Sequence, residues 1–203
     1  MAIKDGMNRF ERIIKRMFDF VSSFLGLVLL SPVFLLVYIS LRIQNDGSVI
    51  FSQERIGYRG KPFKIYKFRT MRVNSECDGK PQLATKGDER LTKVGKFLRE
   101  HHLDELPQLF NVFVGDMSFV GPRPERQYFI DQIKRENPDY DYLYLMRPGV
   151  TSMATIYNGY TDTMEKMLIR LQMDLDYLQN RSLWLDFKII MTTVFNIVKG
   201  KKF

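Results

Sequence analysis

The 203-residue sequence contains a single cysteine, Cys77, and only two histidines, which are adjacent at His101 and His102. One cysteine excludes an internal disulfide framework, and two neighbouring histidines exclude a zinc finger or a multi-histidine metal site. Acidic residues are also in deficit: 23 Asp and Glu stand against 31 Lys and Arg, for a net charge of +8. Such a balance favours a polyanionic partner, which could be a nucleic acid, an anionic membrane or a phosphorylated substrate.

Charge is absent altogether from the 22 residues between Phe20 and Leu41. As a straight helix this segment would be ~33 Å long, against a bilayer hydrocarbon core of ~30 Å. It is too long for a buried helix in a domain of this size, and it does not end in the small residues of a signal-peptide cleavage site. We therefore expect membrane contact. A basic nucleic-acid-binding protein would leave this segment unexplained, so we expect no nucleic-acid partner.

Ser31 and Pro32 lie at the centre of this apolar segment. Proline has no N–H for the carbonyl of Val28, so we expect a kink there, with the Ser31 hydroxyl satisfying part of the freed backbone. Basic residues flank the segment on both sides, and positive charge stays on the cytoplasmic side of a membrane. A bent helix that enters and leaves by one face satisfies both flanks, whereas a kinked single-pass helix satisfies one. The charges alone leave both models open.

Residues 48–71 predict a β-hairpin with a turn region around Gly57 and Gly60. In its second strand the period of two places Lys67 and Arg69 on one face, after two apolar residues. Two cations in that position could point into a cleft, or they could be the solvated charges that are usual on an edge strand.

The polar residues 72–88 are expected to form a loop, and residues 89–101 a helix that has Arg99 near its end. Pro107 suits the first turn of the next helix, where N–H groups have no intrahelical partner. This places Asp104 at or beside the N-cap and Glu105 in the first turn. The residues expected to face the core are Leu106, Leu109, Phe110 and Phe113.

The adjacent acids at this helix start have two interpretations. An aspartate at an N-cap would stabilise the helix by ~1 kcal/mol, which is a sufficient structural reason for Asp104. A helix N-terminus also keeps a carboxylate ionised and attracts phosphate. Two arginines next to prolines, Arg123 in GPRP and Arg147 in RPGV, are suited to hold phosphate at little entropic cost. Together these residues suggest a site for a phosphorylated ligand and a divalent cation.

The C-terminal segment at 182–203 is strongly apolar and ends in basic residues, so it could be an interfacial helix or a core helix.

Several stretches together resemble the bacterial sugar transferase family, the monotopic phosphoglycosyl transferases. They are KRMFDF at 15–20, the apolar segment with Ser31-Pro32, FKIYKFRTM at 63–71, LTKVGKFLR at 91–99, LDELPQLFNVFVGDMSFVGPRP at 103–124 and RPGVT at 147–151. The match runs in order over nearly the whole chain and is most specific at 103–124. The chain resembles the minimal form of the family, without the extra transmembrane bundle that larger members carry in front.

The resemblance implies an α+β monotopic membrane protein with a re-entrant helix bent at Ser31-Pro32, a small β-hairpin and several helices, some of them amphipathic and interfacial. Residues 1–45 would form the membrane-embedded helix with its basic flanks. Residues 46–203 would form one continuous catalytic unit on the cytoplasmic face of the bacterial inner membrane. The anionic bilayer is then a partner, and a homodimer is allowed.

Members of this family transfer a sugar-1-phosphate from a UDP-sugar to undecaprenyl phosphate and release UMP. This is the first membrane step of bacterial exopolysaccharide, capsule, O-antigen or glycoprotein glycan synthesis. By the resemblance, Asp104 is the nucleophile that forms a phosphosugar-aspartyl intermediate, and Glu105 is a ligand of the required Mg²⁺. The cations expected to bind the phosphates and the nucleotide are Lys67, Arg69, Arg99, Arg123 and Arg147.

This chemistry is reasonable from the residues, because Mg²⁺ and fixed cations offset the repulsion between a carboxylate and a diphosphate. Mg²⁺ prefers few carboxylates together with phosphate oxygens, so Glu105 could suffice as its protein ligand. The rival interpretation is a non-enzymatic single-pass membrane scaffold in which Asp104 is only a helix cap.

The chain departs from the family pattern between Ser152 and Tyr157. Many members read Ile-Thr-Gly-Trp/Leu-Ala-Gln-Val-Asn-Gly after Arg-Pro-Gly, whereas the Gly and the Gln are absent here and Asn158-Gly159 comes one place later. That region is expected to shape the sugar or uridine pocket. The donor sugar, the glycan pathway and the oligomeric state are therefore left open.

Overall fold

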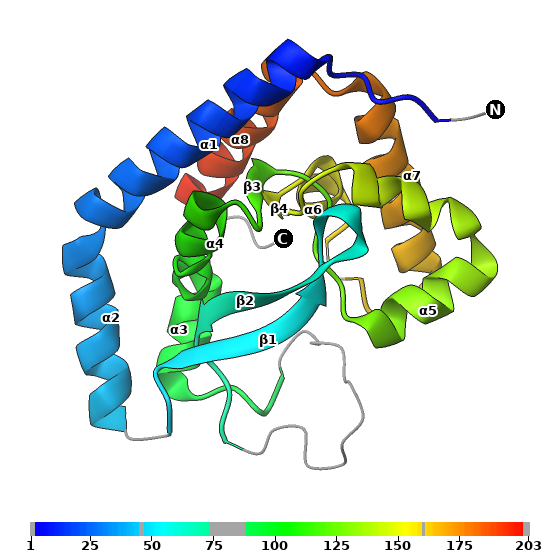
Figure 1. Ribbon diagram of the computed structural model, residues 1–203. Coiled ribbons are helices and arrows are strands. Elements are labelled where there is room, and N and C mark those ends of the chain that lie inside the picture. The colour runs from blue at the N-terminus through cyan, green and yellow to red at the C-terminus, as the bar shows by residue number, and fades with distance from the viewer. Residues whose placement is uncertain (1–2, 45–46, 74–87, 160, 201–203) are drawn as a thin grey trace.

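The computed structural model describes residues 3–44, 47–73, 88–159 and 161–200 (Figure 1). The expected polar loop at 72–88 lies outside them except at its ends. Helices, 3-10 turns (η) and strands follow one another as α1 (Arg9–Leu29), α2 (Ser31–Gln44), β1 (Ile50–Ile56), η1 (Tyr58–Gly60), β2 (Pro62–Phe68), α3 (Lys93–Glu100), η2 (Leu103–Glu105), α4 (Gln108–Val114), β3 (Ser118–Val120), α5 (Gln127–Glu136), η3 (Pro138–Leu145), β4 (Gly149–Thr151), α6 (Met153–Tyr157), α7 (Met164–Asn180) and α8 (Leu183–Val198). The mixture of helices with a small hairpin confirms the α+β class.

The apolar N-terminal segment forms two helices with a sharp bend between them (Figure 1). α1 ends at Leu29, α2 begins at Ser31, and the two helices are bent by 59°. The Ser31 hydroxyl donates to the Val28 carbonyl at 2.7 Å, the group that Pro32 leaves without a donor. The expected kink and its compensation by Ser31 are confirmed.

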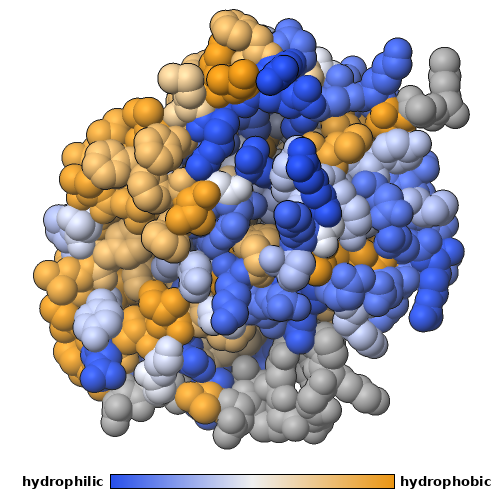
Figure 2. Space-filling model, viewed as in Figure 1, coloured by the Kyte–Doolittle hydropathy of each residue, from blue (hydrophilic) through white to orange (hydrophobic). Residues whose placement is uncertain are grey.

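The bent pair is also the only part of the described chain whose length and composition suit a membrane span. Taken singly, neither helix passes that test, and no other described helix does. Figure 2 shows hydrophobic residues covering the side of the molecule along which α1 and α2 run. Their exposed apolar side chains include Phe10, Met17, Val21, Leu25, Leu29, Leu36 and Ile43.

Polar contacts fasten α1 to the rest of the molecule. Lys15 Nζ lies 2.5 Å from the Asp186 carboxylate on α8 and donates to the Val120 carbonyl at 3.0 Å. Arg16 donates to the carbonyls of Val112 and Phe113, in the last turn of α4, at 2.6 and 2.7 Å. Asp19, which is buried, accepts from the Phe119 N–H at 3.1 Å. Residues of the KRMFDF motif in α1 therefore bind α4, β3 and α8.

The predicted hairpin is present as the antiparallel pair β1–β2, in which Phe51 lies opposite Lys67 and Ile56 opposite Pro62. The turn between the strands contains η1. At the end of β2, Thr70 packs against α3 so closely that a Cβ on Gly95 would lie 2.0 Å from the Thr70 carbonyl oxygen. Only glycine permits this contact.

The helix expected at 89–101 begins later, at Lys93, because Thr92 caps it: the Thr92 hydroxyl accepts from the Gly95 N–H at 2.9 Å. The next helix was also predicted too early. Pro107 precedes α4, while Asp104 lies in the separate turn η2, and no side chain caps either element. The prediction that Asp104 is at or beside the N-cap of this helix, with Glu105 in its first turn, is wrong, because Pro107 is at the N-cap.

The expected core face of α4 is also partly wrong. Phe110 is 47% exposed, whereas Gln108, Asn111 and Val112 are buried. The Asn111 side chain binds β2, accepting from the Tyr66 N–H at 3.1 Å and donating to the Lys64 carbonyl at 2.7 Å. A buried amide thus joins α4 to the hairpin, where an apolar contact was expected.

Two of the three hydrophobic clusters among the described residues are the main cores that support these elements. The larger lies among α5, η3, α7 and α8 and includes Ile130, Ile133, Leu171, Leu178 and Ile189. The smaller joins α2, the hairpin and α3, and both Leu103 and Leu106 pack against it. Because these two leucines flank Asp104 and Glu105, the smaller core positions the acidic pair.

A short parallel pair, β3–β4, joins the end of the 103–124 motif to the RPGV segment. A Cβ on Gly149 would lie 2.1 Å from the Gly121 nitrogen, so the two backbones can touch only because both residues are glycines. The Gly149 N–H donates to the Pro122 carbonyl at 2.9 Å. This pairing fixes the start of the GPRP loop.

The C-terminal segment forms α8, which is neither wholly buried nor wholly exposed. Its inner face buries Asp186 and Ile189. Apolar side chains recur at helical spacing on the opposite face: Trp184, Phe187, Met191, Phe195 and Val198.

Candidate functional site

The acidic pair Asp104–Glu105 lies in the one-turn element η2 between α3 and α4. His102, directly before this turn, has φ +55°, a left-handed conformation that is uncommon for a residue other than glycine. Backbone strain of this kind is often found at functional sites.

Cations from two separate segments converge on Glu105. Lys67 Nζ on β2 donates to Glu105 Oε1 at 2.5 Å, and Arg123 Nη1 from the GPRP loop lies 3.8 Å from the same oxygen. Burial alone would raise the pKa of Glu105, but the charges of Lys67 and Arg123 outweigh it and lower the pKa to about 2. Glu105 is therefore a stable anion.

Asp104 has a different environment, although it is adjacent in sequence. Its residue is 6% exposed, and within the described part of the chain its carboxylate makes no hydrogen bond or ion pair. Burial raises the pKa of Asp104 and the charge of Glu105 adds to the rise, while Lys67 and Arg99 offset it only in part. A poorly solvated, unpaired carboxylate is more available for nucleophilic attack than a solvated one.

Arg99 is held beside this pair by α3 and the end of β2. Its Nε donates to the Thr70 hydroxyl at 3.2 Å, and its charge acts on Asp104. The sequence indicated Arg99 but not Thr70. The one hint at Thr70 in the sequence is that it directly follows Arg69, at the end of the basic strand. Lys67, Arg99 and Arg123 are the predicted cations that the structure brings to the acidic pair.

Two other predicted cations have different partners. Arg69 Nε donates to the Ser48 carbonyl at 2.6 Å, beyond the end of β2. Arg147 Nε donates to the Gly115 carbonyl at 2.8 Å, and its guanidinium lies 5.1 Å from the centre of the Tyr58 ring. Neither contacts Asp104 or Glu105, so a substrate-binding role for Arg69 and Arg147 stays a prediction.

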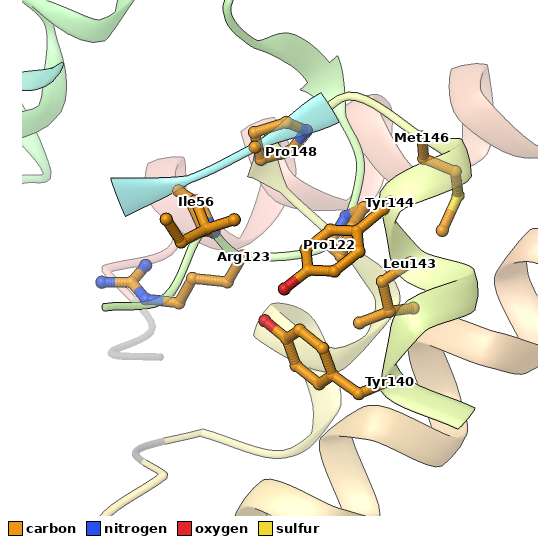
Figure 3. Close-up of a pocket in the computed structure, with 10 residues that line it drawn as sticks. Ile56, Pro122, Arg123, Tyr140, Leu143, Tyr144, Met146 and Pro148 are labelled. Carbon is orange, nitrogen blue, oxygen red and sulfur yellow. The ribbon is translucent and has the colours of Figure 1, made fainter. Parts of the chain in front are cut away.

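A shallow hollow lies on the other side of Arg123 (Figure 3). Its lining includes Tyr140, Leu143 and Tyr144 from η3, together with prolines of the GPRP and RPGV segments. In Figure 3 the two tyrosine hydroxyls point toward each other, and the Arg123 guanidinium extends away from them. The hollow thus combines two tyrosine hydroxyls and a cation at its edge with aliphatic side chains and prolines.

A buried ionic network fixes the end of the GPRP loop. The Glu125 carboxylate accepts from Arg170 Nη2 on α7 at 2.6 Å and from Arg55 Nη1 on β1 at 3.3 Å. Burial alone would raise the pKa of Glu125, but the charges of Arg170 and Arg55 outweigh it and lower the pKa. Sequence reasoning missed all three residues, because nothing in their spacing indicates that they meet.

The residues between Ser152 and Tyr157, where the chain departs from the family pattern, form α6. The Ser152 hydroxyl accepts from the Thr155 N–H at 3.0 Å and so caps this helix. The departure therefore has a local structural reason. Asn158 follows and donates to the Lys166 carbonyl at 2.8 Å on α7.

The acidic pair fits a Mg²⁺ ion that is completed by a substrate. Within the described residues, no three His, Cys, Asp or Glu side chains gather as a ready metal site. Lys67 and Arg123 both approach Oε1 of Glu105, and Oε2 has no partner in the part of the chain that the structure describes. Mg²⁺ commonly takes one or two carboxylates and completes its shell with phosphate oxygens and water.

Comparison with known proteins gives the family. The bacterial sugar transferase family model matches residues 10–200, so the chain belongs to that family. It is 46% identical over 191 residues to a UDP-glucose:undecaprenyl-phosphate glucose-1-phosphate transferase of Klebsiella pneumoniae, covering 93% of this chain and 41% of the relative. It is 38% identical over 203 residues to an exopolysaccharide production protein of Rhizobium leguminosarum bv. phaseoli, covering 95% of this chain and 100% of that relative.

A third relative carries a different sugar in its name. A UDP-N-acetylgalactosamine-undecaprenyl-phosphate N-acetylgalactosaminephosphotransferase of Aeromonas hydrophila is 42% identical over 187 residues, covering 92% of this chain and 44% of the relative. The chain spans less than half the length of this relative and of the Klebsiella protein.

Proposed function

We propose that this protein transfers a sugar-1-phosphate from a UDP-sugar to undecaprenyl phosphate and releases UMP. The observation that carries the proposal is the contrast within the acidic pair: Asp104 is buried and has no hydrogen-bond or ion-pair partner among the described residues, while Glu105 is held as an anion by Lys67. Relatives whose names specify UDP-sugars and undecaprenyl phosphate support the donor and the acceptor.

In the proposed reaction, an Asp104 oxygen attacks the phosphorus that bears the sugar. A bond forms between that oxygen and the phosphorus, the bond to the bridging oxygen breaks, and UMP leaves with the electron pair. A phosphate oxygen of undecaprenyl phosphate then attacks the same phosphorus and displaces the Asp104 carboxylate. The product is an undecaprenyl diphosphate sugar, and the enzyme returns to its starting state.

The surrounding cations have a defined task in both steps. Lys67 holds Glu105, and Arg99 and Arg123 lie where negative charge accumulates on the transferring phosphoryl group. We infer that Glu105 holds Mg²⁺ together with the donor phosphates; a bound Mg²⁺ would neutralise charge on the diphosphate and its leaving group. The hollow beside Arg123 would offer the donor nucleoside tyrosine rings and aliphatic side chains close to that arginine.

We further propose that α1 and α2 form a re-entrant hairpin in the bacterial inner membrane, with the catalytic residues on its cytoplasmic face. The bend at Ser31-Pro32, the exposed apolar side chains of both helices and the basic residues on both flanks support this topology. α8 would lie at the interface, with its apolar face toward the lipid.

The test is UMP release from a panel of UDP-sugars by detergent-solubilised protein, with polyprenyl phosphate and Mg²⁺. Asp104→Asn keeps the shape of the side chain but removes the nucleophile, so UMP release should fall to background. Asp139→Asn, at an exposed position on η3, is the matched control and should turn over like wild type. Incubation with a UDP-sugar but no acceptor should add a sugar phosphate to the peptide that contains Asp104, detected by mass spectrometry.

Full activity of Asp104→Asn would contradict the covalent mechanism. Failure of every nucleotide-sugar donor with wild-type protein would instead favour a non-enzymatic membrane scaffold.

A further inference from the structure

Arg123 sits in a loop whose backbone is fixed on both sides while its own side chain is left partly free. Before it, the Pro122 carbonyl accepts from the Gly149 N–H at 2.9 Å. After it, the Glu125 carbonyl accepts from the Ile56 N–H at 3.0 Å. The Arg123 side chain is 43% exposed and reaches to 3.8 Å from Glu105.

The carboxylate of Glu125 makes the second attachment much stronger. Arg170 Nη2 and Arg55 Nη1 bind its two oxygens, and Arg55 Nη1 also donates to the Pro124 carbonyl at 3.3 Å. Arg170 Nη1 is held in turn by the Thr161 hydroxyl at 2.7 Å. Through Glu125, both the hairpin (Arg55) and α7 (Arg170) are bound to the residues that follow Arg123.

The presence of such a buried ionic network is poorly explained by the free energy of folding that it contributes. Removing an Arg–Glu–Arg group from water costs about as much free energy as the charges return, so buried ion pairs contribute little net stability. Their directional hydrogen bonds do fix geometry. A long arginine side chain can meet a substrate phosphate reproducibly only if its backbone does not move.

We propose that Glu125 is a positioning residue for Arg123: by binding Arg55 and Arg170 it sets where the Arg123 guanidinium meets the donor phosphates. This inference rests on the proposed function for its kinetic readout. It assigns Glu125 no contact with substrate.

The kinetic test uses Glu125→Gln, which keeps the size of the side chain and removes its charge. We expect kcat/KM to fall by about 10- to 100-fold, the range expected when a contact group is displaced by a fraction of a bond length to about 1 Å. Asp162→Asn is the control. Asp162 lies just before α7 and forms an exposed ion pair at 2.6 Å with Lys166, which is on the same helix as Arg170. That control should retain wild-type kcat/KM.

The deciding comparison is made in an Arg123→Ala background. If Glu125 acts through Arg123, Glu125→Gln should cause no further loss there, and both single variants should divide their loss between KM and kcat in the same way. An equal loss with and without Arg123 would show that Glu125 only supports the fold, and wild-type activity of Glu125→Gln would also overturn the proposal.

Arg170→Lys is the second variant, used if Glu125→Gln does not fold; it keeps the charge but loses the paired geometry. It should show the same dependence on Arg123.

A readout without turnover separates this inference from the proposed function. The rate at which phenylglyoxal modifies Arg123, followed by mass spectrometry, should rise in Glu125→Gln because the loop that carries the guanidinium is no longer fixed. An unchanged rate would overturn the positioning role even in an inactive protein. An increased rate in a protein that processes no UDP-sugar would keep the positioning role and reject the proposed function.

Discussion

At the scale of single residues, the acidic pair shows how neighbours in sequence acquire different chemistry. Glu105 lies within hydrogen-bonding distance of Lys67, and the side chain of Asp104 has no such partner among the described residues. The difference arises from β2 and the GPRP loop, which are distant in sequence and both approach from the side of Glu105.

Lys67→Met tests the importance of this contact. Removing the ammonium leaves Glu105 with a weaker counter-charge and, in the proposed reaction, lowers the positive charge near the donor phosphates. We expect kcat to fall by about 10²- to 10³-fold, as for other lost electrostatic contacts in active sites. Lys64→Met is the control, because Lys64 is exposed on the same strand. Initial rates of UMP release measure both; equal losses in the two variants would reject a specific role for Lys67.

Asp174 on α7 is a second carboxylate whose environment sets its charge. It is buried, its Oδ1 has no partner among the described residues, and burial raises its pKa from 3.8 to about 7 against the charge of Arg170. In the folded protein Asp174 therefore keeps a proton that the unfolded chain loses near pH 4. Because the folded state binds more protons, stability should fall as pH rises from about 4 to about 7, then level off.

Asp174→Asn cannot ionise and should lack this pH dependence. We expect the variant to have a higher unfolding midpoint than wild type at about pH 8 and the difference to shrink toward about pH 5. Thermal unfolding across this range in one detergent is the measurement. A difference that stayed constant with pH would show that Asp174 does not titrate as its environment predicts.

At the scale of elements, one buried ion pair joins α1 to α8 in the described part of the chain. Lys15 and Asp186 are 2.5 Å apart with side chains 12% and 9% exposed, and Asp186 also accepts from the Tyr177 hydroxyl. Lys15→Met would leave the Asp186 carboxylate buried without its cation. We expect a loss of about 3 kcal/mol in the free energy of unfolding.

The matched control for Lys15→Met is on the same helix. Arg12 pairs with Asp5 at 3.1 Å but is 49% exposed, so Arg12→Met should cost roughly 0–1 kcal/mol. Denaturant unfolding of both variants gives the comparison. Equal losses would mean that burial of the Lys15–Asp186 pair has no special effect on α1.

Elements with a local cause were predictable from the sequence. The bend at Ser31-Pro32 follows from a missing N–H, and the hairpin follows from alternating side chains around a glycine-containing turn. Elements fixed by distant partners were not. η2 separates Asp104 from α4 because Leu103 and Leu106 pack into the smaller core, a contact that no local pattern reveals.

The same distinction applies to the candidate site. Lys67, Arg99 and Arg123 could be found because each lies beside a strand end, a helix end or a pair of prolines in the sequence. Arg170 could not be found in this way, because it meets Glu125 across a sequence separation of 45 residues. The sequence also does not reveal that Lys67 pairs with Glu105 and not with Asp104, because this depends on the direction from which β2 approaches the acidic pair.

At the scale of the whole molecule, the apolar surface and the acidic pair belong to connected parts of one structure. α4 is the next element after the turn that carries Asp104 and Glu105, and its Phe113 stacks on Phe20 of α1 with ring centres 4.9 Å apart. A membrane that received α1 and α2 would therefore lie near the elements that carry the site. The proposed reaction, with one lipid substrate and one soluble nucleotide substrate, requires such proximity.

The proposed topology predicts the location of both ends of the bent pair. Cysteines introduced singly as Lys4→Cys and Ser48→Cys, in a Cys77→Ser background, lie at exposed positions on either side of α1 and α2. A membrane-impermeant maleimide should leave both unlabelled in intact cells and label both in inverted inner-membrane vesicles. Permeabilised cells provide the control for reactivity. Labelling of one position from outside would place the two ends on opposite sides. The helices would then cross the bilayer, because a 59° bend without a return to the same face is only a kink in a single span.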